Sequence, residues 1–340
     1  MARKCVEENE RIKRRYLQYL REAKRSDTAT VDKAADAILR FERSTGFKPF
    51  KRFHIDHPVK FKAQLSESKS EKTGKPLSKA TIDGTLRAVK AFVLWLAGQP
   101  GYRSRISYAD AEYFNLNAKD ARIAHAERDT PFPTMEQCRH AFAQMPSATP
   151  LQRRDKALFA FLMLTGARDG AIASMRLKHI DLVQGCVYQD ARDVKTKFAK
   201  TFTTTFFPVD EDYLQSFRDW VAFLRKDQLF GPSDALFPKP LMGLKDGEFA
   251  SLGLSRANYG NAGKIRDVIK TAFTDAGLPP FGPHSFRKTL GIMANECCKT
   301  PEQFKAWSLN LGHESIAATL SAYCPVSPTR QAELIRGMAA

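Results

Sequence analysis

The sequence lacks the features that would assign it to several common classes of protein. Its six cysteines are scattered, and no pair has the C-x-x-C spacing typical of zinc sites and redox motifs. The most apolar run, residues 157–164, is far too short to span a bilayer. The first residues are basic and lead into glutamates, unlike a signal peptide. We expect a protein of the reducing cytosol without disulfides, metal or another cofactor.

Acidic residues are also few compared with basic ones. The 340 residues include 54 lysines and arginines against 37 aspartates and glutamates, which gives a formal charge of +17. A surface this basic attracts polyanions, because contacts with phosphate groups release condensed counterions. The charge favours a nucleic acid partner, although an uncommitted basic surface would have the same composition.

The length and the hydrophobic pattern predict two domains joined by a linker. Residues 1–117 have helical spacing of apolar positions and are expected to form a small helical domain. Residues 118–133 are charged, weakly periodic and end in a Pro-Phe-Pro sequence, as is typical of a linker. Residues 134–340 would form the second domain. In the first domain, helices are expected over residues 8–24, 30–45, 57–65 and 78–97. In the second, they are expected from residue 134, then over residues 151–164, 211–226, 263–276, 285–297, 301–310, 316–322 and 328–338.

One helix of the first domain carries polar and basic residues opposite its apolar side. Ser78 is its expected N-cap, and its outer face includes Lys79, Thr81, Arg87 and Lys90. A solvated charged face is the ordinary explanation for such a helix. Given the charge of the whole chain, a face that contacts DNA phosphates is the alternative, and these four residues are our candidates for it.

Two short patterns in the second domain carry arginines in positions suited to an anion. Gly166 lies two residues before Arg168, which places a guanidinium at a tight turn between two expected helices. His284 and Arg287 open another helix at positions i and i+3, so they lie on one face near its N-terminus. Each pattern alone is common, and a C-cap glycine or a structural His–Arg pair would explain it.

A third pattern lies near the C-terminus. Leu311-Gly312-His313 precedes a short expected helix that ends at Tyr323. A single tyrosine in such a place is usually a packed aromatic residue. Between the first two patterns, residues 185–209 are rich in β-branched and aromatic residues and are expected to form a basic β-hairpin.

Taken in chain order, Gly-x-Arg, the basic hairpin, His-x-x-Arg, Leu-Gly-His and the tyrosine resemble the active-site constellation of the tyrosine recombinase (phage integrase) family. The resemblance covers the whole chain. It implies a mainly α fold with a small antiparallel β-sheet, in which a helical core-binding domain precedes a catalytic domain that begins at about Thr134.

The resemblance implies a transesterification of double-stranded DNA. Tyr323 would attack the scissile phosphodiester, forming a 3′-phosphotyrosyl bond and releasing a 5′-hydroxyl, without ATP or a metal ion. Exchange of partner strands through a Holliday junction would reverse the step. Arg168 and Arg287 would bind the charged phosphorane oxygens. His284 would accept or organise the tyrosine proton, and His313 would donate a hydrogen bond to phosphate or support the site.

Three lysines of the expected hairpin compete for the role of the general acid that protonates the leaving 5′-oxygen. They are Lys195, Lys197 and Lys200. In the family, this lysine precedes a strand that ends in an apolar residue and a proline. Lys200, followed by residues 201–207 and a proline, matches that layout best, and Lys197 is the second choice.

Two features depart from the family's pattern. An acidic residue usually follows the first arginine by three positions, where this chain has Ala171, so that only the neighbouring Asp169 is available to replace it. In addition, His313 and Tyr323 are ten residues apart, one more than the commonest spacing. One residue rotates a helical side chain by about 100°.

The resemblance further implies a homotetramer on two DNA duplexes, in the prokaryotic cytoplasm and associated with the nucleoid. The apolar side of residues 328–338 would dock either on its own domain or on a neighbouring protomer. Two other functions remain open. One is a type IB-like topoisomerase, which relaxes supercoils without partner strands, and the other is a catalytically inactive DNA-binding relative.

Overall fold

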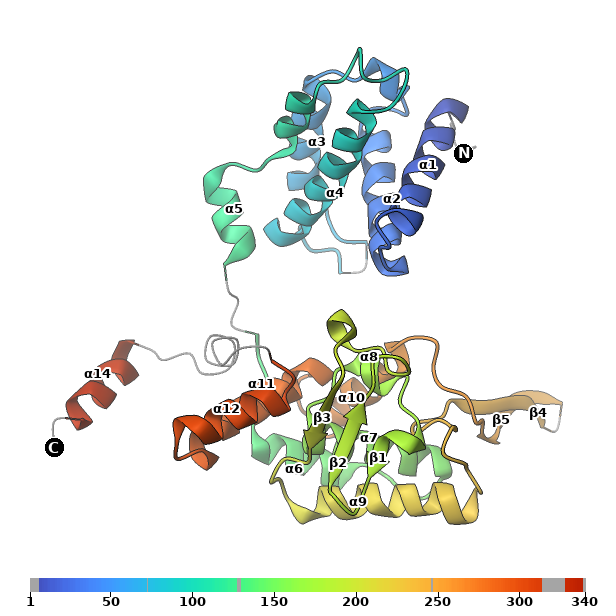
Figure 1. Ribbon diagram of the computed structural model, residues 1–340, viewed down its shortest axis with the longest axis vertical. Helices are drawn as coiled ribbons and strands as arrows, with labels where there is room; N and C mark the ends of the chain where they lie inside the picture. Colours follow the sequence, from blue (N-terminus) through green and yellow to red (C-terminus); the bar gives the residue numbers. More distant parts are fainter. Residues whose placement is uncertain (1–5, 72, 127–129, 246, 314–327, 339–340) are drawn as a thin grey trace. The chain divides into compact units, whose positions relative to one another are not determined.

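The computed structural model describes residues 6–71, 73–126, 130–245, 247–313 and 328–338. The chain divides at residue 130 into two units, each with its own hydrophobic core (Figure 1). No helix in the described ranges is long and apolar enough to cross a membrane. The four cysteines within these ranges are not joined by disulfides.

The first unit is built from helices. They are α1 (Glu7–Glu22), α2 (Thr28–Ser44), the 3₁₀ turn η1 (Phe50–Arg52), α3 (Asp56–Glu67), α4 (Lys79–Ala97), the 3₁₀ helix η2 (Tyr108–Phe114) and α5 (Ala118–His125). The four expected helices are confirmed, and Ser78 caps α4 as predicted by accepting a hydrogen bond from Thr81 N. The start of α2 differs from the expected residue 30, because Asp27 is its N-cap. The Asp27 carboxylate accepts the Thr30 N–H at 2.6 Å.

The fifth helix lies in the stretch expected to be a linker. Asn117 caps α5 by accepting the Asp120 N–H at 2.7 Å, and the helix packs against α4. An ion pair of 3.0 Å between Lys79 and Asp120 joins the two helices. The stretch between the units is therefore shorter than the expected residues 118–133, because capping and an ion pair hold a segment with weak hydrophobic periodicity.

A buried polar group connects α1 to the rest of the first unit. Asn9 is fully buried, and its amide donates to Glu42 Oε1 and to the Lys48 carbonyl, both at 3.0 Å. Its carbonyl oxygen accepts the Phe50 N–H at 3.0 Å. Lys13 also donates to Glu42, whose carboxylate is buried and needs these partners. One asparagine thus fixes three segments that are distant in sequence.

We expect Asn9→Ala to destabilise the first unit by about 2–4 kcal/mol, because Oε1 of the buried Glu42 carboxylate and the Phe50 N–H each lose their hydrogen bond to Asn9. Urea unfolding followed by circular dichroism would measure the loss. Gln18→Ala, an exposed substitution on the same helix, is the matched control and should change little. Equal effects of the two substitutions would contradict the prediction.

The second unit surrounds one buried helix. Its helices are α6 (Met135–Gln144), α7 (Pro150–Thr165), α8 (Asp169–Ile172), α9 (Glu211–Ala222), α10 (Gly263–Asp275), α11 (Pro283–Cys297), α12 (Pro301–Asn310) and α14 (Pro328–Gly337), with short turns η3 (Leu177–His179), η4 (Lys197–Ala199) and η5 (Phe223–Asp227). Residues 157–165 of α7 are all buried, because α6, α9, α10 and α11 pack around them. The expected helices are confirmed, except that residues 316–322 lie outside the described residues.

The strands form two small antiparallel sheets. They are β1 (Ile180–Asp181), β2 (Cys186–Gln189), β3 (Phe202–Thr205), β4 (Pro240–Lys245) and β5 (Glu248–Leu254). The β2–β3 pair, in which Val187 faces Thr204, is the expected hairpin. The β4–β5 hairpin projects from the unit (Figure 1) and was not predicted, because Gly243, Gly247 and Gly253 interrupt the alternation typical of strands. A mainly α fold with small antiparallel sheets is thus confirmed.

Candidate active site

Arg287, on α11, joins the three patterns that the sequence separates. Its side chain is 2% exposed, and Nη1 donates to the Gly166 carbonyl at 2.6 Å. Nη2 donates to the Leu311 carbonyl at 2.6 Å and to His313 Nε2 at 2.9 Å. Because a guanidinium has no acceptor, the His313 Nε2 must accept, and the proton of the neutral imidazole lies on Nδ1.

The first pattern is the turn between α7 and α8. Gly166 ends α7 in the left-handed conformation (φ +55°), and a Cβ there would lie 3.0 Å from Leu311 Cδ2. Glycine is required for both reasons. Arg168 follows as the N-cap residue of α8 and is partly exposed. Within the described ranges no hydrogen bond or ion pair engages the Arg168 side chain, in contrast to Arg287.

The third pattern is the turn that follows α12. Gly312 has φ +72°, and a Cβ there would come within 2.7 Å of the Phe202 ring, which belongs to β3. The absence of a side chain lets β3 approach this turn closely. His313 is 9% exposed. Tyr323 lies outside the described residues, so its role as the nucleophile stays a prediction.

Asn310 was not among the predicted site residues, but it fixes β3 beside this turn. Its side chain donates to the Thr205 carbonyl at 2.8 Å and accepts the Thr205 N–H at 2.7 Å. The Asn310 carbonyl accepts a further bond from the Thr204 hydroxyl at 3.1 Å. Asn310 thus pairs with the strand as another strand would. The only hint in the sequence is its place just before Leu-Gly-His.

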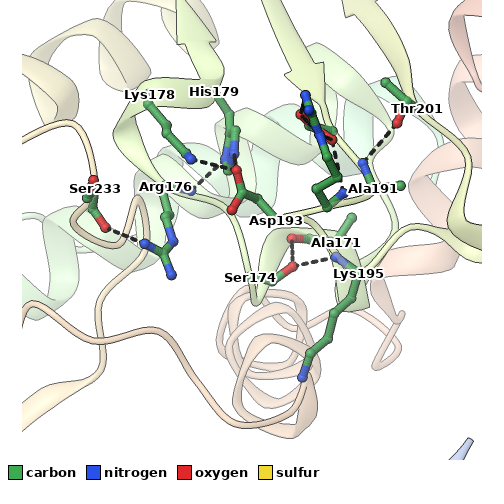
Figure 2. Close-up of polar contacts among 12 residues, drawn as sticks. Ala171, Ser174, Arg176, Lys178, His179, Ala191, Asp193, Lys195, Thr201 and Ser233 are labelled. Atoms are coloured by element: carbon green, nitrogen blue, oxygen red, sulfur yellow. Dashed lines mark hydrogen bonds and ion pairs between the residues drawn. The ribbon is translucent and has the colours of Figure 1, made fainter.

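The connection between β2 and β3 carries all three candidate lysines, and side chains of the second unit anchor its base (Figure 2). Ala191 N–H donates to the Thr201 hydroxyl at 3.0 Å, which closes the base of the connection. Lys195 N–H donates to Ser174 Oγ at 2.8 Å, and that hydroxyl donates to the Ala171 carbonyl at 2.9 Å. Ser174 therefore ties the lysine connection to α8, whose N-cap is Arg168.

A second anchor lies at Asp193. Its carboxylate is 2.5 Å from Lys178 Nζ and 3.7 Å from Nε2 of the buried His179 (Figure 2). His179 Nδ1 accepts the Arg176 N–H at 3.0 Å, so its proton lies on Nε2, facing the carboxylate. These contacts hold the first half of the connection on η3.

The lysines of the connection differ in direction. Lys195 Nζ lies 3.4 Å from the Gly260 carbonyl. Among the effects that lower the pKa of each histidine, the positive charge of Lys200 contributes least at His313, and that of Lys197 contributes least at His284. The choice between Lys197 and Lys200 stays a prediction, while the Lys195 ammonium is engaged at Gly260.

Both histidines favour the neutral form. Burial, followed by the charges of Arg287 and Arg168, lowers the pKa of His313 to about 4. His284 is exposed in the first turn of α11, where partial desolvation and then the same two arginines lower its pKa below the usual value. A neutral imidazole accepts a proton, as the predicted role of His284 requires.

The acid missing after the first arginine is not replaced by its neighbour. Ala171 is buried, and Asp169 is paired with Arg266 of α10, with 2.5 Å between Oδ2 and Nε. Asp169 also accepts the N–H of Gly170. The backbone carbonyl of Ala171 accepts a hydrogen bond from the Ser174 hydroxyl, which in turn accepts the Lys195 N–H. Position 171 therefore helps to hold the lysine connection.

The predicted DNA-contact residues of α4 are engaged within the first unit. Its three cations each form an ion pair with an acid of the same unit. The pairs are Lys79 with Asp120 at 3.0 Å, Arg87 with Asp83 at 2.9 Å and Lys90 with Glu112 at 2.9 Å. Thr81 contacts the Ser78 hydroxyl at 2.9 Å. The face is polar as expected, but each of its three cations is matched by an acid, one from α4 itself and the others from η2 and α5.

No group of three or more metal-binding side chains is present in the part of the chain that the structure describes. The arrangement around Arg287 instead collects cations and neutral imidazoles. Such a group is suited to binding a phosphodiester and stabilising additional negative charge on it.

Comparison with known proteins gives the same answer. The model of the phage integrase family matches residues 133–330, more than half of the chain. Similar solved structures include a lambda integrase dimer bound to a COC′ core site, with a TM-score of 0.61, 14% identity and coverage of 93% of this chain and 95% of that chain. Comparison with curated proteins found no match.

Two further structures have the same fold. The Tn1549 transposon integrase in complex with transposon right-end DNA has a TM-score of 0.59 and 16% identity, with coverage of 97% of this chain and 99% of that chain. The XerH site-specific recombinase bound to a palindromic difH substrate has a TM-score of 0.60 and 16% identity, with coverage of 95% and 82%.

A helical unit followed by a unit that gathers Arg168, Arg287 and two histidines defines the tyrosine recombinase fold. The chain belongs to the phage integrase family. It is a site-specific recombinase that breaks and rejoins DNA strands.

The depressed pKa of His313 predicts a pH-dependent stability. An unfolded histidine takes up a proton near pH 6.5, whereas folded His313 stays neutral down to about pH 4. Between these values the unfolded state binds more protons. The free energy of unfolding therefore decreases as the pH falls through this window, with a contribution on the order of 1–3 kcal/mol.

Urea unfolding at pH 7.5 and pH 4.5 would measure this contribution. In His313→Asn the decrease between the two pH values should be smaller than in the wild type, because the titrating group is gone. His140→Asn, at an exposed position of α6, is the matched control. An unchanged pH dependence in His313→Asn would contradict the prediction.

Proposed function

We propose that Tyr323 attacks the scissile phosphodiester of one DNA strand, forming a 3′-phosphotyrosyl bond as the bond to the 5′-oxygen breaks. The 5′-hydroxyl of a partner strand then attacks the phosphotyrosine, releases Tyr323 and creates a Holliday junction. The observation that carries this proposal is the set of Arg287 hydrogen bonds, which joins the three polar patterns around one centre.

The two arginines have different roles in this proposal. Arg168 is partly exposed and has no recorded acceptor in the described ranges, so its planar fork is available to the phosphate oxygens. Arg287 is buried and holds the site together, while its fixed charge contributes to stabilising the phosphorane. His313, protonated on Nδ1, is a neutral hydrogen-bond donor for the phosphate.

Proton transfers fall to His284 and Lys200. His284 is exposed and favours the neutral form, as a group must if it is to take the tyrosine proton. Lys200 lies two residues before Phe202, the first residue of β3, whose ring packs against Gly312 in the turn of His313. Its ammonium would give a proton to the leaving 5′-oxygen, with Lys197 as the second choice.

We further propose that the first unit, residues 1–117 together with α5, is a core-binding domain that contacts DNA. Support comes from the net charge of the chain and from the DNA-bound neighbours of the same fold. Contact of Lys79, Arg87 and Lys90 with phosphate would compete with their present ion pairs. Exposed pairs of this kind contribute about 1 kcal/mol or less, so phosphate can displace the acids.

The assembly that fits strand exchange between two duplexes is a homotetramer, which acts in the cytoplasm of a prokaryote on nucleoid DNA. Ile335 of α14 and Met338, which directly follows that helix, are 62% and 74% exposed. Such apolar exposure favours docking on a protein surface, either of the same protomer or of a neighbour. Cross-linking of α14 to the rest of the second unit, in a mixture of differently tagged protomers, would distinguish docking within a protomer from docking between protomers.

Covalent capture tests the reaction itself. The probe is a pool of nicked suicide duplexes with a randomised segment, from which denaturation-resistant adducts are recovered and sequenced. We expect wild-type protein to yield adducts that converge on one sequence, and Tyr323→Phe to yield none, because the phenol oxygen is the nucleophile. Tyr188→Phe, at a 45% exposed tyrosine of β2, is the matched control and should react like wild type.

Failure of the wild type to form any adduct would refute the recombinase mechanism and favour a catalytically inactive relative. Relaxation of supercoiled plasmid that lacks the selected sequence would instead favour a type IB-like topoisomerase. Ala171, which is buried, replaces the usual acid. We expect this replacement to change the rate of covalent capture but not the reaction itself.

A thiol leaving group identifies the general acid. We expect Lys200→Ala to slow cleavage of the selected duplex on the order of 10²- to 10³-fold, because the 5′-oxygen leaves without a proton. With a bridging 5′-sulfur, cleavage should return close to the wild-type rate, since a thiolate needs no protonation. If Lys197→Ala slows cleavage and the bridging 5′-sulfur restores its rate, while Lys200→Ala cleaves at close to the wild-type rate, the general acid is Lys197.

A further inference from the structure

The tip of the β2–β3 connection has a feature that the proposed reaction does not use. The base of the connection is fixed by Thr201, Ser174 and Asp193, as described above. The tip, η4, consists of Lys197, Phe198 and Ala199, and Lys200 directly follows it.

The backbone of this tip is strained. Phe198 has φ +60° and Ala199 has φ +51°, two successive left-handed residues without a glycine. The left-handed region costs an ordinary residue on the order of 1–2 kcal/mol, and such strain is concentrated at functional sites. Glycine at either position would avoid this cost. The presence of Phe198 in a strained position therefore suggests a function for its side chain.

The strain presents a large apolar side chain to solvent. Phe198 is 81% exposed, although the second unit has an extensive core that could have taken it. Within the described ranges, its only cation–π or aromatic partner is the Lys197 ammonium, 4.8 Å from the ring centroid. Burial of an aromatic ring of this size is worth about 1.5–3 kcal/mol, which is lost while it stays exposed.

The ring belongs to a connection whose two ends are held against the site. At one end, the Lys195 N–H binds Ser174, which is tied to α8, whose N-cap is Arg168. At the other end, the Phe202 ring packs against Gly312. A phosphate held by Arg168 would therefore bring the adjoining nucleotides near this connection and its tip.

We propose that Phe198 is a DNA-contacting residue that stacks on the base next to the scissile phosphate and holds that base out of the duplex stack. The inference rests on the proposed function, because it places the ring by reference to the cleaved phosphodiester. Aromatic side chains stack on any base, at about 1–3 kcal/mol per base. Apolar side chains inserted between base pairs unstack them.

Charge favours DNA over a protein as the partner of this ring. Residues 190–201 contain four cations and two acids. Both acids are already paired, Asp190 with Arg192 at 2.6 Å and Asp193 with Lys178 at 2.5 Å. The lysines around Phe198 would lie near backbone phosphates while the ring reaches the base.

The test uses the duplex selected by covalent capture, with 2-aminopurine as the base next to the cleaved phosphate. In the wild-type adduct we expect fluorescence to differ from that of the free duplex, because the base stacks on a phenyl ring in place of its neighbour. Phe198→Ala should remove this difference and lower the cleavage rate about 10-fold, or up to about 100-fold. Phe198→Trp should keep most of both.

Two controls separate the ring from the fold. Ala199→Gly relieves the backbone strain but keeps the ring, and should retain the fluorescence difference. Val183→Ala removes an apolar side chain that is 92% exposed in the β1–β2 turn, and should leave both readouts unchanged. If Phe198→Ala cleaves at the wild-type rate and gives the wild-type fluorescence, the inference is wrong while the recombinase mechanism stands.

A photo-cross-link tests the contact independently of cleavage. With p-benzoylphenylalanine at position 198, we expect light-dependent cross-linking to a mixed-sequence duplex, well above that of the same residue at position 183. If wild type forms no covalent adduct, the proposed function fails. Absence of the position-specific cross-link would then separately overturn the role of Phe198 as a DNA contact.

Discussion

The site depends on one buried guanidinium. Arg287 is almost completely enclosed, and a charge in that position is tolerated only when fixed acceptors surround it. The acceptors are two main-chain carbonyls, of Gly166 and Leu311, and one ring nitrogen, of His313. Gly166 lies in the turn after α7, and Leu311 and His313 lie in the turn after α12, so these two turns can occupy only the places that satisfy the arginine. The geometry of the site follows from this requirement.

The requirement explains the neighbouring residues. Gly166 and Gly312 have left-handed backbones, and the space of a Cβ at each is taken by Leu311 or by Phe202. Asn310 holds β3 against the same turn through its side-chain amide. The pKa of His313 is lowered in this arrangement, since burial and then the charges of Arg287 and Arg168 disfavour a second proton on the imidazole.

Around this rigid centre, the β2–β3 connection combines a fixed base with a strained, exposed tip. The Ser174 hydroxyl accepts the Lys195 N–H of the connection and donates to the Ala171 carbonyl of α8. One hydrogen-bond network therefore links Arg168, the N-cap residue of α8, to the segment that carries the lysines. In the proposed reaction, a charged arginine, two neutral histidines and a lysine ammonium would act together on the DNA phosphate. Preorganised charge of this kind lowers the barrier to phosphoryl transfer without rearrangement during the reaction.

Much of the fold could be predicted because its signals are local. Apolar periodicity and capping residues placed most helices within a few residues, and β-branched residues marked the central hairpin. α5 was missed since its apolar periodicity is weak, and part of what holds it is the Lys79–Asp120 ion pair, whose members are distant in sequence. Two further ion pairs, of Arg87 with Asp83 and of Lys90 with Glu112, show that the cations of the α4 face are matched by acids. The β4–β5 hairpin was missed because glycines hide its pattern.

The sequence by itself determined the order of Arg168, His284, Arg287 and His313 along the chain and the kind of chemical group that each side chain offers. Only the tertiary structure decided that Arg287 is an internal anchor, that Asp169 pairs with Arg266 and that the Lys195 ammonium lies at the Gly260 carbonyl. The reason is that hydrogen-bond partners are chosen in space, between segments whose approach no local pattern encodes.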